Sequence, residues 1–130
     1  MDADERRCLS DDEITGMVIG AAYKVANTLG LGFLEKVYEN ALSHELRKCG
    51  LHVEQQFSIK VVYDGVCVGD FFVDLLVENQ IVIELKYAKG IDDAHLAQCL
   101  NYLKATQNSL ALLINFGTPR VQVKRVVLNH

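Results

Sequence analysis

The sequence has no apolar run that approaches the about 20 residues a membrane-spanning helix needs. Its opening, MDADERRCLSDDE, is too polar for a secretory signal peptide. Internal repeats, low-complexity tracts and linkers are also missing. We therefore expect a single domain over residues 1–130 in the cytoplasm, with no membrane contact and with residues 1–10 as a flexible N-terminal segment.

The four cysteines include no C-x-x-C pair, which disfavours a zinc site. Without a secretory context, their even number is weak support for disulfides. We expect them to be reduced thiols that are mostly packed, and Cys49 and Cys99 fall on apolar helix faces. The remaining two are Cys8 and Cys67.

The chain also lacks the positive charge that is common in nucleic-acid-binding proteins, since its net charge is −4. The charges are unevenly distributed: residues 1–79 hold 14 acids and 7 bases, whereas residues 80–130 hold 3 acids and 6 bases. A local basic surface built from the C-terminal half remains compatible with this distribution. Half of the residues are apolar, as in a folded globular protein.

Hydrophobic periodicity predicts helices and strands along nearly the whole chain. The first helix begins at a capping box, Ser10-Asp11-Asp12-Glu13, and should end at Gly30-Leu31-Gly32, while Gly50 is placed as the C-cap of the second. The expected helices span about 10–29, 34–49 and 92–106, and the expected strands 57–63, 66–77, 81–87, 109–116 and 121–128.

This order, α-α-β-β-β-α-β-β, predicts an α/β (α+β) protein. Tight turns at Asp64-Gly65 and at Glu78-Asn79-Gln80 should join the first three strands as an antiparallel meander. The third helix should then cross over to a parallel neighbour. The expected architecture is a mixed sheet of about five strands flanked by helices.

Three charged residues interrupt the apolar run GDFFVDLLVENQIVIELK, namely Asp74, Glu84 and Lys86. Side chains alternate across a strand, so Glu84 and Lys86 should share one face. A turn centred near Asn79 places residue 74 opposite residue 84. The three charges should therefore form one cluster.

Two adjacent carboxylates repel each other unless a cation or a shared proton relieves the repulsion. Mg²⁺ prefers such hard oxygen ligands, and a neighbouring lysine could hold a phosphate or orient a water molecule. A structural ion pair of Lys86 with Asp74 or Glu84 at a sheet edge is the alternative explanation.

Two helices carry further candidate residues. His95, Gln98 and Tyr102 share one face of the third helix, which could also be an ordinary polar helix side. Glu35 and Tyr38 lie near the start of the second helix, where a first-turn acid needs no other explanation.

The chain resembles the GxxExxY family of small bacterial and archaeal proteins. Gly32, Glu35 and Tyr38 match its G-x-x-E-x-x-Y signature, and the segments HLAQCLNYLKAT and LLINFG also resemble that family. The resemblance extends from about Ile14 to Leu128.

This family is placed within the PD-(D/E)XK nuclease-like superfamily, so the resemblance implies a restriction-endonuclease-like core of order α-β-β-β-α-β. Asp74 matches the metal-binding aspartate of the superfamily, and Glu84 with Lys86 matches its (D/E)-x-K motif. Glu35 matches a further metal-binding acid from the first core helix. Val73 stands where the superfamily pattern has proline.

The resemblance also implies substrate contacts. Gln98 and Tyr102 resemble the Q-x-x-x-Y motif of the exonuclease-like branch, which lies near the active site and contacts DNA. We include His95 and Tyr38 among the expected substrate-binding residues.

The favoured interpretation is a Mg²⁺-dependent (or Mn²⁺-dependent) phosphodiesterase acting on DNA, with RNA as the alternative substrate. Asp74, Glu84, Glu35 and the carbonyl of Leu85 would hold the metal, and Lys86 would position or activate the attacking water.

Two other interpretations remain. One is a non-catalytic nucleic-acid-binding or accessory module that has kept the nuclease fold. The other is a homodimeric interaction protein that uses Ser109–Phe116 or the last strand as an edge.

Overall fold

The computed structural model describes residues 8–129. Three helices and five strands follow one another in the expected order: α1 (Asp11–Leu29), α2 (Glu35–Lys48), β1 (Val53–Tyr63), β2 (Val66–Val77), β3 (Ile81–Lys86), α3 (Asp93–Thr106), β4 (Leu110–Asn115) and β5 (Gln122–Val127). Among the described residues, no helix combines the length and the apolar composition needed to cross a bilayer.

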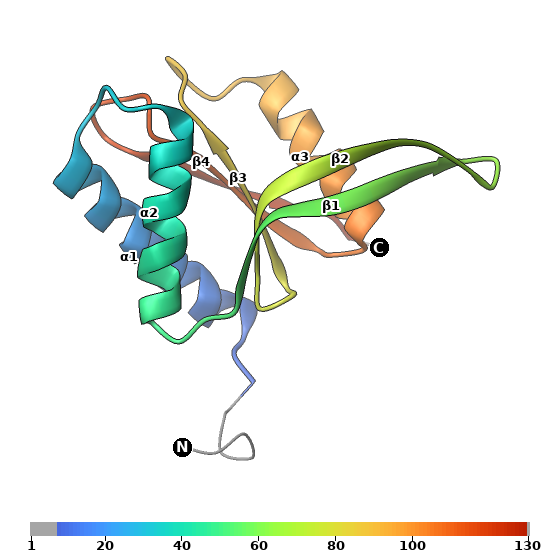
Figure 1. The fold of residues 1–130 in the computed structure, drawn as a ribbon, viewed down its shortest axis with the longest axis horizontal. Helices are drawn as coiled ribbons and strands as arrows, with labels where there is room; N and C mark the ends of the chain where they lie inside the picture. The colour runs from blue at the N-terminus through green and yellow to red at the C-terminus, as the bar shows by residue number, and fades with distance from the viewer. Residues whose placement is uncertain (1–7, 130) are drawn as a thin grey trace.

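The five strands form one mixed sheet in the order β1-β2-β3-β4-β5. Strands β3 and β4 are parallel and are joined through α3, whereas the other neighbouring pairs are antiparallel. Helices α1 and α2 cover one face of the sheet and α3 covers the other (Figure 1). The meander, the crossover and the mixed sheet predicted from the sequence are confirmed.

Strand alternation divides the core into two layers. Apolar residues of α1 and α2 pack against the odd-numbered residues of β3 and the even-numbered residues of β4. Apolar residues of α3 pack against the alternate set, the even-numbered residues of β3 and the odd-numbered residues of β4. By alternation, the side chains of Glu84 and Lys86 point to the α3 face of the sheet. The other residues of β3 are buried and aliphatic. The charged residues therefore lie at the end of a strand that is otherwise part of the core.

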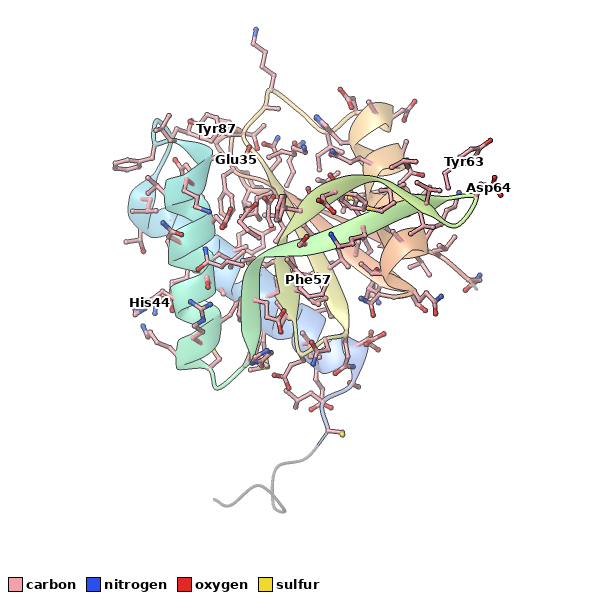
Figure 2. All side chains as sticks on the ribbon, turned by 45° about the vertical axis from the view of Figure 1, so that its right-hand side comes forward. Glu35, His44, Phe57, Tyr63, Asp64 and Tyr87 are labelled. Carbon is pink, nitrogen blue, oxygen red and sulfur yellow. The ribbon has the colours of Figure 1, made fainter. Side chains whose placement is uncertain are left out.

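The β1–β2 hairpin is much longer than its neighbours and extends beyond the rest of the sheet, past α3 (Figure 1). Its turn residues Asp64 and Gly65 have φ angles of 53° and 76°, as a two-residue hairpin turn requires. Tyr63 and Asp64 lie at its exposed tip (Figure 2). The tip of the hairpin, residues 63–68, thus stands away from both helical layers.

The loops that follow β3 and β4 are in close contact at Gly117. A Cβ atom added there would lie 2.4 Å from the backbone nitrogen of Ala88. Gly117→Ala should therefore lower the free energy of unfolding by at least about 1–3 kcal/mol, measured by urea denaturation. Gly16→Ala, in open space on α1, is the control and should raise it by about 0.5–1 kcal/mol. Equal stability of the two variants would contradict the packing described.

Three expectations about the ends and edges of elements need correction. Strand β1 begins at Val53 rather than Phe57, because Val53 is buried although the polar residues 54–56 follow it. Strand β4 lies between β3 and β5, so the segment Ser109–Phe116 offers no free edge for a dimer. Of the expected flexible segment, Leu9 packs against the core and Ser10 caps α1, while residues 1–7 lie outside the described residues.

The cysteines are free thiols, as expected, but most of them are not packed. Only Cys99 is buried among the four, whereas Cys8, Cys49 and Cys67 are exposed. Cys49 occupies the C-cap position of α2, one residue before the Gly50 expected there, and its side chain is exposed.

Candidate active site

Asp74 and Glu84 lie next to each other where β2 and β3 stop pairing. The pairing runs through Val77↔Ile81 to Leu75↔Ile83, so residues 74 and 84 are the next pair in register. The backbone N–H of Asp74 donates to Oε1 of Glu84 (3.0 Å), and the N–H of Leu85 donates to Oδ2 of Asp74 (2.8 Å). The adjacency predicted from the turn at residue 79 is therefore confirmed.

Burial makes ionisation of this pair unfavourable. Glu84 is 4% exposed, and its burial, together with the charge of Asp74, raises its pKa from 4.5 to about 8. Burial also raises the pKa of Asp74, against the opposing effect of its hydrogen bonds from Leu85 and Gln56. Without a bound metal ion, the Glu84 carboxyl therefore holds a proton at neutral pH.

Lys86 lies close to the carboxylates without forming an ion pair with them. Its charge lowers the pKa values of both Asp74 and Glu84. No ion pair between residues 8 and 129 includes Lys86, so the interpretation of the cluster as a structural ion pair is not supported. Its ammonium group is available for a ligand.

Glu35 lies at the exposed rim of the cluster, in the first turn of α2. Partial burial raises its pKa, and the charge of Asp74 raises it further, while Lys86 and the backbone of Tyr87 oppose this shift. Figure 2 shows Glu35 and Tyr87 near each other at this end of the helix. A helix on one face of the sheet thus brings an acid to the strand end that carries Asp74 and Glu84.

The donor chemistry of the site fits a hard divalent cation. Each oxygen of Asp74 accepts one hydrogen bond and keeps a lone pair for a further ligand. However, among residues 8–129 no three acidic, histidine or cysteine side chains are arranged to hold a metal ion. The structure thus brings together two of the carboxylates that a metal ion would need, Asp74 and Glu84. Metal binding would require loss of the Glu84 proton and the approach of a third ligand to this pair.

Gln98 and Tyr102 line a hollow of about 650 Å³ between α3 and the β1–β2 hairpin. Tyr102 stacks on Phe71, with ring centroids 4.5 Å apart. Burial, followed by the charges of Glu84 and Asp74, raises the pKa of Tyr102 to about 12. Lys60 and Lys104 also line this hollow, which therefore combines aromatic, amide and basic groups beside the carboxylates.

Two expected substrate-binding residues have structural roles. His95 completes the capping box of α3, since its Nδ1 accepts from the N–H of Asp92. Tyr38 is fully buried; its hydroxyl donates to the carbonyl of Gly30 and its ring stacks on Phe116. Burial leaves Tyr38 no surface for a substrate, and this corrects the assignment made from the sequence.

Two residues near the site were not predicted. Glu39, on α2, is 3% exposed. It accepts hydrogen bonds from Gln55 and Gln56 and forms an ion pair with Lys36. Glu39 follows Glu35 by four residues, which places both acids on the same helix face. This spacing could have predicted that Glu39 lies near the site. Gln56, which also donates to Asp74, lies in a polar run with no distinguishing pattern.

The fold and the charged strand end define this chain as a restriction-endonuclease-like α/β protein. The family model described as the PD-(D/E)XK nuclease superfamily matches residues 12–126, and the chain belongs to that superfamily. Nuclease function in this superfamily generally involves divalent metal ions.

A solved structure described as "Crystal structure of SSO0001" has the same fold, with a TM-score of 0.56 and 18% sequence identity. The similarity covers 92% of this chain and 61% of the other, so the chain spans about three fifths of that protein. No curated protein matches the chain.

Proposed function

We propose that the protein is a divalent-metal-dependent phosphodiesterase that cleaves DNA. The observation that supports this most directly is the pairing of Asp74 with Glu84 at a strand end, beside a lysine without an ion-pair partner in residues 8–129. Buried carboxylates with raised pKa values stabilise a fold poorly, which favours a functional reason for their presence.

In this proposal Asp74, Glu84 and Glu35, with the carbonyl of Leu85, hold Mg²⁺ or Mn²⁺. The cation would polarise the scissile phosphate and lower the pKa of a bound water molecule. The backbone N–H groups of Asp74 and Leu85 fix the two carboxylates in orientation. Lys86 positions the attacking water and stabilises negative charge that develops on the phosphate.

The hollow beside α3 supplies the proposed substrate contacts. Gln98 and Tyr102 line it, and Lys104 contributes a positive charge. Lys124 of β5, on the α3 face of the sheet, could add contacts to phosphates that are independent of base sequence. Arg125 lies on the other face and pairs with Asp12 of α1. We include DNA in the proposal and treat RNA as an outcome to be tested.

Incubation with plasmid DNA, single-stranded DNA or RNA tests this function. We expect DNA cleavage with Mg²⁺ or Mn²⁺, and a complete loss of cleavage when EDTA removes the metal, because the carboxylates alone offer no cation to the phosphate. Gel electrophoresis of the products measures both results. Intact DNA under every metal condition would refute the proposal, and cleavage of RNA alone would change the substrate.

A non-catalytic nucleic-acid-binding module is the second candidate. The net charge of −4 and the absence of a preformed three-ligand metal site within residues 8–129 favour it. Salt-dependent DNA binding that neither requires a metal nor leads to cleavage would support this candidate over the phosphodiesterase.

A further inference from the structure

Gln56 has an unusual backbone conformation for a residue inside a strand. Its φ angle is 52°, in the left-handed region that residues with a side chain seldom adopt. The other non-glycine residues with positive φ in residues 8–129 lie in turns or at a helix end. Such conformations persist where the surroundings impose them and are concentrated at functional sites.

The strain occurs directly opposite Asp74. Pairing between β1 and β2 passes from Gln55↔Leu75 to Phe57↔Val73 and omits the step between Gln56 and Asp74. The side-chain Nε2 of Gln56 donates to Oδ1 of Asp74 at 3.1 Å. The backbone irregularity and the side-chain contact are therefore at the same position.

The same nitrogen also donates to Oε1 of Glu39, at 2.8 Å. An amide NH₂ group has two N–H donors and carboxylates only accept, so each donor of Gln56 is used by one carboxylate. Glu39 is itself held by Lys36 and by Gln55, at 2.8 Å each. A buried, fixed acid on α2 therefore sets the orientation of the Gln56 amide.

We propose that Gln56 is a positioning residue: held by Glu39, it fixes the Asp74 carboxylate in the orientation that binds the metal ion. The inference rests on the proposed metal-dependent function. Oδ2 of Asp74 is oriented by the Leu85 N–H and Oδ1 by Gln56, so the carboxylate plane is set from two strands. Groups that orient a metal ligand in this way typically change metal affinity by about 10- to 100-fold when removed.

Gln56→Gly is the most informative variant because it removes the amide and relieves the strained φ at the same time. Titration of the purified protein with Mn²⁺, followed by isothermal calorimetry, should show affinity about tenfold weaker than that of the wild type. Thermal unfolding should show little net change in stability, because the backbone strain that glycine relieves offsets the hydrogen bonds lost to Glu39 and Asp74. A purely structural role predicts the opposite pattern, with lower stability and unchanged affinity.

Gln107→Gly is the matched control. Gln107 has a φ of 61° at the end of α3 and is exposed, so the variant makes the same residue change and the same relief of strain away from the site. It should bind Mn²⁺ with wild-type affinity. Gln56→Met, which keeps the side-chain length without a donor, should weaken binding as Gln56→Gly does.

A metal-free measurement separates this inference from the proposed function. In NMR spectra recorded with EDTA, the amide proton of Leu85 should shift in Gln56→Gly and not in Gln107→Gly, because Leu85 reports on the orientation of Asp74. Wild-type Mn²⁺ affinity in Gln56→Gly would overturn the positioning role while leaving the metal site intact. A wild-type protein that binds no Mn²⁺ would overturn both proposals.

Discussion

Lys86→Ala should lower the rate of DNA cleavage by about 10²-fold or more, because one group that stabilises transition-state charge is typically worth this much. Its ammonium group lies near Asp74, Glu84 and Glu35 and would be free to contact a phosphate or a water molecule. Single-turnover cleavage of plasmid DNA at saturating Mg²⁺ is the measurement, since it separates the chemical step from product release.

The fold should tolerate this substitution. Lys86 is half-buried, and none of the ion pairs within residues 8–129 depends on it. Far-ultraviolet circular dichroism of Lys86→Ala should therefore match that of the wild type. Lys89→Ala removes the same charge three residues away on an exposed loop and should leave the chemical step nearly unchanged. Equal cleavage rates for the wild type and Lys86→Ala would refute the role assigned to Lys86.

The central part of the site could be predicted from the sequence because its geometry is local. Asp74 and Glu84 are separated by one tight turn, and the turn together with strand alternation determines both their pairing and their face. Lys86 follows by the same alternation. The order of elements could be predicted in the same way, since most elements have clear apolar periodicity and α1 and α3 begin at capping boxes.

The residues that orient the site depend on long-range packing and could not be predicted. Gln56 approaches Asp74 through a positive φ angle that no feature of its polar neighbours indicates. Tyr38 was assigned to the substrate, whereas packing against Phe116 buries it completely. Burial of a residue beside the apolar stripe of a helix depends on how that helix lies on the sheet, which the helical period alone does not give.

The contrast between Glu35 and Glu39 shows the same limit. Both acids lie on α2 one helical turn apart, and one is exposed at the rim of the cluster while the other is buried beneath it. Their sequence positions are compatible with either role. The contacts that distinguish them come from β1, through Gln55 and Gln56.

Glu84→Gln should make the metal-free protein more stable than the wild type above pH 8. Burial raises the pKa of Glu84 from 4.5 to about 8, so the folded state binds this proton more tightly than the unfolded state. Wild-type stability should then fall as pH rises from 4.5 towards 8, at about 1.4 kcal/mol per pH unit from this group. Glutamine does not ionise, and its side-chain oxygen can still accept from the N–H of Asp74.

Urea denaturation in the presence of EDTA measures this difference at a series of pH values. The free-energy advantage of Glu84→Gln should be near zero below pH 4.5 and reach several kcal/mol above pH 8, because each unit of pKa shift corresponds to about 1.4 kcal/mol. Asp93→Asn, an exposed carboxyl in the first turn of α3, is the control and should show no such dependence between these pH values. An advantage of Glu84→Gln that does not grow with pH would contradict the raised pKa.

Addition of Mg²⁺ should reduce the stability advantage of Glu84→Gln above pH 8. A cation bound by Asp74 and Glu84 stabilises the ionised wild type, whereas Glu84→Gln has lost one carboxylate ligand and gains much less. The same acid would then destabilise the metal-free fold and hold the cation that relieves its repulsion from Asp74. Stabilisation of both proteins to the same extent by Mg²⁺ would show that Glu84 does not bind the metal.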